Sequence, residues 1–151
     1  MKVLILVDIQ NDFIPGGALA VKDGDAVVAI ANRLMDRFDL VVATQDWHPA
    51  DHGSFASNHP GKAVFDRIEL DGLPQVLWPD HCVQGTPGAD FAPGLDRARI
   101  DTVFRKGADP AVDSYSGFYD NGRRNSTGLG EWLKERGVAA AWAEAVHRAV
   151  E

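Results

Sequence analysis

The chain has 151 residues, of which 45% are hydrophobic and 25% are charged, proportions that are ordinary for one globular domain over 1–151. A formal net charge of -7 disfavours nucleic acid and anionic membranes as partners. The single cysteine, Cys82, excludes an intrachain disulfide and is compatible with the cytoplasm. The apolar run near the start ends at Asp8, so it is too short for a signal peptide or a membrane span.

The first half of the sequence predicts a βαβ unit. Residues 2–8 form a continuous apolar run, which is typical of a parallel strand that is buried on both faces. A loop follows, with a turn at 15–17, and residues 25–38 then place apolar side chains at three- and four-residue steps. These steps predict an amphipathic helix. A second strand over 40–44 completes the unit, whose crossover should be right-handed.

The middle of the chain is less regular. Residues 51–94 are rich in Pro, Gly, His and Asp and lack periodicity, so we expect a functional loop. A third strand is expected near 101–106. Ser126 or Thr127 can then cap a helix that Gly137 is placed to end. Together these elements predict an α/β fold with a mostly parallel sheet flanked by helices.

The alanine-rich tail favours a helix by propensity. Val138, Trp142, Val146 and Val150 fall on one helical face, and we expect a helix over about 140–149. This apolar stripe should make Trp142 buried.

Charged side chains follow three of the expected strands. Asp8 comes after the first, Asp46 and His48 after the second, and Lys106 after the third. Because ligands of open α/β sheets bind beyond the carboxyl ends of the strands, these side chains should share one crevice. Asp8 is a candidate general base and Lys106 a candidate partner for an anion. The alternatives are a carboxylate satisfied by backbone N–H groups and an exposed lysine, but a buried carboxylate and a neighbouring lysine support each other.

Asp46, His48 and His81 offer a carboxylate and two imidazoles. This ligand set suits Zn, Fe(II) or Mn and leaves positions open for a ligand or water. The spacing alone would also fit a surface aspartate and two loop histidines. The position of Asp46 at a strand end and the run Trp78-Pro79-Asp80-His81 favour the metal site.

Several longer motifs occur in a fixed order along the chain. They are VDIQNDF at 7–13, PGG at 15–17, DWHP at 46–49, WPDHCVQGT at 78–86, FRKG at 104–107 and DSYSGF at 113–118. From Met1 to about Val138 the chain resembles the nicotinamidase/pyrazinamidase branch of the isochorismatase-like cysteine hydrolases. The resemblance implies a six-stranded α/β fold and hydrolysis of nicotinamide to nicotinate and ammonia, a step of NAD salvage.

The resemblance also implies roles for individual residues. Asp8 would accept a proton, and Lys106 would be the electrostatic partner of a catalytic cysteine. Phe13 and Trp78 would form the walls of a flat slot for a small pyridine carboxamide, and Tyr115 is a weaker candidate for its rim. For each aromatic residue the alternative is a loop anchor in the core.

The metal site is completed differently among the relatives that the chain resembles. Asp46, His48 and His81 are the implied ligands. His52 is a candidate fourth ligand, and Ser54 is a second candidate that would approach through water.

The expected nucleophile is a cysteine beyond the motifs quoted above. Cys82 follows a candidate metal ligand, at a position that is not the nucleophile in the family, so we expect a packing residue. From about 139 onward the sequence departs from the family pattern of a strand and a turn bearing the catalytic cysteine. We therefore expect a fold truncated on its C-terminal side, little activity from these 151 residues alone, and a homo-oligomer that covers the bare sheet. The alternative is a non-catalytic metal-binding or pyridine-binding protein.

Overall fold

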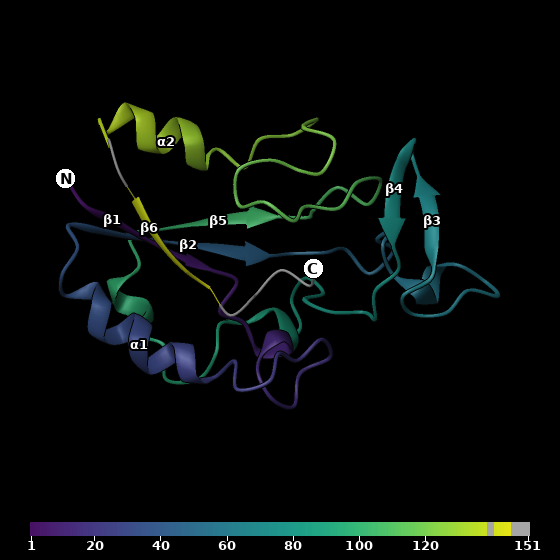
Figure 1. The fold of residues 1–151 in the computed structure, drawn as a ribbon, viewed down its shortest axis with the longest axis horizontal. Coiled ribbons are helices and arrows are strands. Elements are labelled where there is room, and N and C mark those ends of the chain that lie inside the picture. The colour runs from purple at the N-terminus through teal and green to yellow at the C-terminus, as the bar shows by residue number, and fades with distance from the viewer. Residues whose placement is uncertain (139–140, 146–151) are drawn as a thin grey trace.

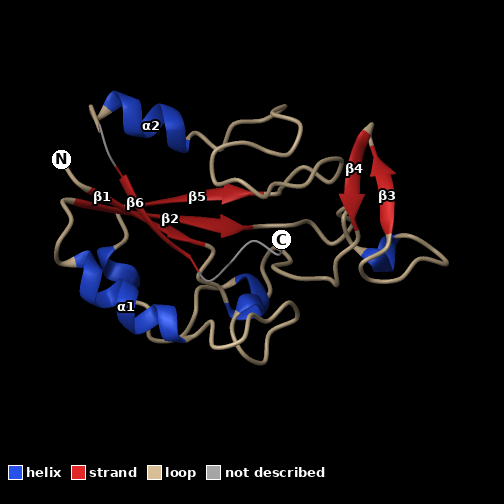
Figure 2. Ribbon diagram, in the orientation of Figure 1, coloured by secondary structure: helices blue, strands red, loops and turns tan. Residues whose placement is uncertain are grey.

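The computed structural model describes residues 1–138 and 141–145. Its main sheet has four parallel strands in the order β5-β2-β1-β6 (Figures 1 and 2). The strands are β1 (Val3–Val7), β2 (Leu40–Asp46), β5 (Thr102–Lys106) and β6 (Ala141–Ala145). This arrangement confirms the predicted α/β fold with a parallel sheet.

Two helices cover opposite faces of the sheet (Figure 1). Helix α1 (Ala26–Met35) packs against Leu4 and Leu6 of β1, within the range predicted from periodicity. Helix α2 (Leu129–Glu135) packs against Val3 and Ile5 on the other face. Successive side chains of a strand point to opposite faces, so β1 contributes to two hydrophobic cores at once.

The C-terminal end of α2 agrees with the expectation from sequence, whereas its N-cap is Gly128 and not Ser126 or Thr127. Gly128 is the residue before the helix, and the Thr127 hydroxyl oxygen accepts a hydrogen bond from the Leu129 N–H at 3.2 Å. At the other end Gly137 has a φ of 64°, which glycine adopts at little cost. The Val138 N–H then closes the last turn by donating to the Leu133 carbonyl.

The segment 51–94 contains a β-hairpin where a long functional loop was expected. Strands β3 (Arg67–Leu70) and β4 (Leu73–Val76) pair antiparallel. The turn between them is Asp71-Gly72, and both residues have positive φ, 47° and 83°. This is the geometry of a tight hairpin turn, for which Asp-Gly is a preferred sequence. The loop prediction was therefore wrong for this part of the segment.

The helix predicted for the tail is wrong at Ala141–Ala145. These residues form β6, which pairs in parallel with β1 from Val3↔Ala141 to Val7↔Ala145. Pairing satisfies the backbone groups along the free edge of β1, and this outweighs the small helix preference of alanine. The remainder of the predicted helix lies outside the described residues, as does the expected burial of the Trp142 side chain.

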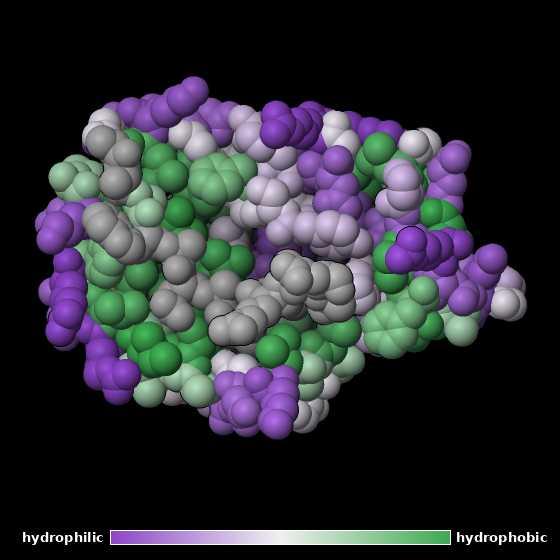
Figure 3. All heavy atoms as spheres, viewed as in Figure 1, coloured by the Kyte–Doolittle hydropathy of each residue, from purple (hydrophilic) through white to green (hydrophobic). Residues whose placement is uncertain are grey.

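The surface gives two further facts. No helix in the described part of the chain is long and apolar enough to cross a membrane. On the face seen in Figure 3, apolar residues gather beside α1, and hydrophilic residues lie along the left and lower margins of the view.

Candidate active site and metal centre

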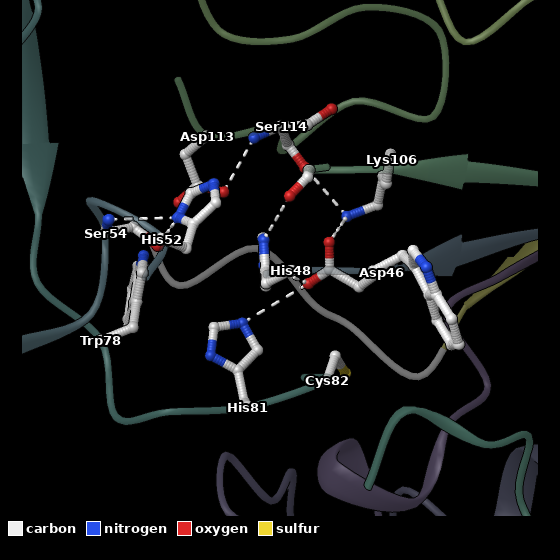
Figure 4. A network of polar contacts seen from close by, with 12 residues as sticks. Asp46, His48, His52, Ser54, Trp78, His81, Cys82, Lys106, Asp113 and Ser114 are labelled. Atoms are coloured by element: carbon white, nitrogen blue, oxygen red, sulfur yellow. Dashed lines mark hydrogen bonds and ion pairs between the residues drawn. The ribbon is translucent and has the colours of Figure 1, made fainter. Parts of the chain in front are cut away.

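The carboxyl ends of β1, β2 and β5 bring three charged side chains into contact. Asp8 follows β1, and Asp46 and Lys106 are the last residues of β2 and β5. The Lys106 Nζ lies 3.0 Å from the Asp8 Oδ2 and 2.9 Å from the Asp46 Oδ1. All three side chains are buried. The structure thus brings the sequence-predicted charges together, with the lysine bridging two carboxylates. Figure 4 draws the contact between Lys106 and Asp46.

Lys106 and Asp46 hold each other in their charged forms. Burial alone would lower the pKa of Lys106, but the Asp46 and Asp8 carboxylates raise that pKa above its ordinary value. Burial alone would raise the pKa of Asp46, but attraction to Lys106 and His48 holds it well below the usual range. Asp8 also accepts a hydrogen bond from the Thr44 hydroxyl at 2.6 Å. The site therefore contains an ionised carboxylate at Asp46, and hydrogen bonding to Thr44 fixes the position of the Asp8 side chain.

Asp46, His48 and His81 form a compact cluster of potential metal ligands. The Asp46 Oδ2 lies 3.0 Å from the His48 Nε2 and 3.4 Å from the His81 Nε2. One ligand atom from each residue lies within 4.8 Å of the others. On the far side of each ring, the Nδ1 lies 2.8 Å from a backbone carbonyl, that of Gly107 or Pro79. Donation from Nδ1 leaves the Nε2 lone pair for a metal, so this donor set fits a divalent transition ion.

Gly107, directly after β5, helps to orient the His48 ring. The residue follows Lys106 directly, has a φ of 69°, and turns its carbonyl toward the His48 ring. A Cβ at this position would collide with that ring and approach the Asp46 carboxylate. The Lys-Gly pair at the end of β5 therefore supplies the cation and also the acceptor that orients His48.

His52 and Ser54 are bonded to each other rather than to the Asp46 cluster. The His52 Nδ1 lies 2.7 Å from the Ser54 Oγ, and its ring centroid is 4.3 Å from that of His48. Burial, followed by repulsion from His48, lowers the pKa of His52 to about 4. The Asp113 and Asp46 carboxylates oppose this shift. Within the described residues the buried His52 Nε2 makes no hydrogen bond. His52 also forms a second group of potential ligands with His48 and Asp113.

The predicted aromatic residues lie near this cluster with unequal exposure. Phe13 is buried, and its ring centroid is 5.6 Å from that of His81. Trp78 is half-buried and donates from its Nε1 to the Tyr115 hydroxyl at 3.2 Å. Tyr115 itself is 59% exposed. Phe13 therefore borders the metal ligands directly, whereas Tyr115 fixes the indole of Trp78 from the surface.

Cys82 is packed rather than activated. Its side chain is fully buried, and its N–H donates to the Asp12 Oδ2 at 2.7 Å. Burial, and then the nearby Asp46 carboxylate, raise the pKa of the thiol above its ordinary value. A reactive cysteine needs the opposite environment, so the expectation of a packing role agrees with the geometry.

Comparison with known proteins identifies the family. The sequence profile of the isochorismatase domain matches residues 2–141. The chain belongs to the isochorismatase family. Within this family the chain is 55% identical to the nicotinamidase of Escherichia coli (strain K12) over 141 residues, which are 91% of this chain and 66% of that protein. The chain thus spans slightly less than two thirds of this relative's length.

Solved structures of two nicotinamidases and a pyrazinamidase share the fold. Acinetobacter baumanii nicotinamidase superimposes with a TM-score of 0.90 at 48% identity, covering 94% of this chain and 69% of that one. The yeast nicotinamidase Pnc1p bound to the inhibitor nicotinaldehyde gives 0.90 at 31%, covering 97% and 76%. The pyrazinamidase of Pyrococcus horikoshii in complex with zinc gives 0.71 at 33%, covering 97% and 70%.

The sequence did not predict the residues that form hydrogen bonds to the site residues and so fix their positions. Thr44 and Gln10 contact Asp8 and Asp46 directly, and both are fully buried. A hydroxyl inside an otherwise apolar strand was the available signal for Thr44. Gln10 stands within the first motif, but nothing local indicates that its amide reaches a residue 36 positions away.

Proposed function

We propose that this protein hydrolyses the carboxamide of a small pyridine, with nicotinamide as the first candidate, to the carboxylate and ammonia. The observation that carries the proposal is the buried Lys106 that joins Asp8 to Asp46 at the edge of a two-histidine cluster. One crevice thereby holds a base, a cation and a potential metal site. The identity to the Escherichia coli nicotinamidase supports the same activity.

Asp46, His48 and His81 would hold one divalent ion, for which Zn, Fe and Mn are the candidates. The zinc complex of the Pyrococcus horikoshii pyrazinamidase favours zinc. When bound, the ion supplies a Lewis-acid site that can hold the nitrogen of a pyridine ring. His52 or Ser54 is the candidate for a fourth ligand.

The aromatic residues give the substrate its place. Phe13 lies against His81, and Trp78 is held by Tyr115, so Phe13 and Trp78 are the proposed walls of the substrate slot. The nicotinaldehyde complex of the yeast relative supports a ligand of this shape.

In the proposed reaction a cysteine thiol attacks the carboxamide carbon. Asp8 takes the thiol proton, Lys106 stabilises the resulting thiolate, and the proton leaves with ammonia. Water then hydrolyses the acyl-enzyme to release the carboxylate and restore the thiol. The resemblance assigns the cysteine to a turn beyond the matched residues 2–141. Cys82 is not placed for this step, because it is buried and its pKa is raised.

We also propose a cytoplasmic role in NAD salvage and association into a homo-oligomer. The net charge of -7 argues against nucleic acid and membrane surfaces as partners. Among the described residues β6 pairs only with β1, so its outer edge offers backbone groups for a further strand. Light scattering on the purified protein should show a dimer or larger species, and a monodisperse monomer would contradict the oligomer.

The experiment that tests the function uses the complete gene product. The intact mass of the purified protein and the DNA sequence beyond codon 138, read in every reading frame, establish which residues this gene product contains. Ammonia release from nicotinamide is then compared for the parent, Asp8→Asn and the exposed control Asp51→Asn. Asp8→Asn should lower kcat/KM by about 10²-fold or more, while the control should retain activity. A metal-loaded protein that binds nicotinamide without turnover would refute the hydrolase and leave the non-catalytic binding protein.

A further inference from the structure

The backbone of Asp46 lies where the central strands separate. β1 and β2 pair as far as Val7↔Thr44, and the Asp8 N–H still reaches the Thr44 carbonyl at 3.3 Å. Asp8 then adopts a φ of 53°, and β1 turns away. Alternate residues of a strand direct their N–H and C=O groups to the same side. Asp46 is therefore the next residue of β2 that faces β1, at the point where β1 has left the sheet.

The side chain of Gln10 takes the place of the missing strand. Its Oε1 accepts a hydrogen bond from the Asp46 N–H at 2.8 Å, and its Nε2 donates to the Asp46 carbonyl at 2.9 Å. The Nε2 also donates to the Ala89 carbonyl at 2.9 Å. Both amide hydrogens are used, and the residue is fully buried, so the amide has one fixed orientation.

We infer that Gln10 is a positioning residue for the metal centre. Its amide pairs with both backbone groups of Asp46 and so fixes the Cα from which the carboxylate reaches toward the two imidazoles. Lys106 restrains the second carboxylate oxygen of Asp46, because its Nζ donates to the Asp46 Oδ1 at 2.9 Å. Without Gln10 both backbone groups of Asp46 would lose their partners in a buried place, and the strand end would move to satisfy them. This inference rests on the proposed metal site.

The expected effect is a loss of metal affinity. Groups that orient metal ligands typically contribute about 10–100-fold to affinity, because a ligand misplaced by a fraction of an ångström binds poorly. The Gln10 side chain contacts Asp46 through the Asp46 backbone groups and is not a member of the ligand cluster. A change in metal affinity therefore reports its action through Asp46.

Gln45 provides a matched control. It is also a buried glutamine, and its Nε2 donates to the same Ala89 carbonyl at 2.9 Å. Its Oε1 accepts from the Arg105 Nε at 3.2 Å rather than from Asp46. Replacing Gln45 by leucine therefore removes a buried amide of the same kind beside the same carbonyl, but leaves the Gln10–Asp46 pairing intact.

The test measures Zn²⁺ dissociation constants for the metal-free parent, Gln10→Leu, Gln10→Glu and Gln45→Leu. Competition with a chromophoric chelator gives the constants, and thermal unfolding of each metal-free protein shows that it is folded. Gln10→Leu should weaken Zn²⁺ binding by about 10–100-fold, and Gln45→Leu by less than this range. Gln10→Glu keeps an acceptor for the Asp46 N–H and loses both donors, so it gives the same test if the leucine variant does not fold. The absorption spectrum of bound Co²⁺ should also change in the Gln10 variants alone.

The outcomes separate this inference from the proposed function. If the parent binds Zn²⁺ and the Gln10 variants bind it equally tightly, the inference is wrong while the metal site stands. The inference is also wrong if Gln10→Leu and Gln45→Leu weaken binding to the same extent. A folded parent that binds no Zn²⁺, Co²⁺ or other divalent ion would overturn the metal site, and the positioning role with it.

Discussion

Replacing Lys106 by methionine should invert the way in which acid affects the stability of this protein. Lys106 is the buried cation between Asp8 and Asp46, with its Nζ at 3.0 and 2.9 Å from their oxygens, and it also donates to the Ser114 carbonyl. Methionine preserves much of the side-chain volume and removes the charge. Two carboxylates then remain in the interior without the cation that they share.

The expected loss at pH 7 is about 3 kcal/mol in the free energy of unfolding. Two unit charges 3 Å apart attract by roughly 5 kcal/mol at an effective dielectric constant of about 20, but burying the lysine offsets much of this. Removing one partner of a buried ion pair costs about 3–5 kcal/mol. The Asp46 carboxylate raises the pKa of His48. In the metal-free variant His48 can therefore take up a proton and balance the charge of Asp46, so we expect the lower end of this range.

The pH dependence follows from the direction of each pKa shift. In the parent the pKa of Asp46 is lowered, so its contribution is complete above the ordinary carboxyl pKa of about 4 and is lost as pH falls further. In Lys106→Met the two uncompensated carboxylates should have raised pKa values. A folded state with raised carboxyl pKa values binds protons more readily than the unfolded chain, so acidification stabilises it. The difference between parent and variant should therefore shrink from pH 7 toward pH 4.

Urea denaturation of the metal-free proteins, followed by circular dichroism at several pH values from 7 to 4, measures this difference. Lys62→Met is the control, because Lys62 is exposed, and it should change stability by no more than about 0.5 kcal/mol. The reasoning fails if Lys106→Met is as stable as the parent at pH 7, or if the difference does not depend on pH.

Three further predictions concern the thiol, the metal and the reaction. Cys82 should react with a soluble thiol reagent only after denaturation, because it is buried with a raised pKa; rapid reaction of the native protein would contradict this. Elemental analysis should find near-stoichiometric Zn, Fe or Mn, and His81→Ala should lose it, whereas a parent that remains metal-free after incubation with these ions would exclude the site. Cys82→Ser should leave the release of ammonia from nicotinamide by the complete gene product unchanged, because the thiol is buried and its pKa is raised; turnover abolished by that change would make Cys82 the nucleophile.

The parallel sheet and its charged end could be predicted because their signals are local. The continuous apolar runs at 3–7 and 40–43 need burial on both faces, and the charged residues Asp8 and Asp46 that come after them lie at the carboxyl end of the sheet. The contact between Lys106 and the two carboxylates then follows from strand adjacency, which the βαβ unit and the third strand suggest. This is why the structure brings together the charges that the sequence separates by dozens of positions.

The β3–β4 hairpin and β6 were missed for different reasons. The turn Asp71-Gly72 was a readable signal, but its flanking strands are short and carry few of the residues that favour strands. β6 has no comparable local signal, because Ala141–Ala145 favours a helix when considered alone. Its strand conformation comes from the free edge of β1, a property of the sheet and not of the segment.

Side chains that replace backbone hydrogen-bond partners fix the segments that carry the metal ligands. The sequence did not predict these contacts, because they join residues that are far apart along the chain. A crevice forms only where neighbouring strands separate, and separation leaves backbone groups of the ligand segments unpaired. The segment after β1 supplies the substitutes: Gln10 pairs with the backbone of Asp46, and Asp12 accepts from the N–H of Cys82, next to His81. One short stretch, 8–13, thus contributes the proposed base and restrains both segments that carry metal ligands. A substitution there should disturb metal binding and proton transfer together, although no residue of the stretch belongs to the ligand cluster.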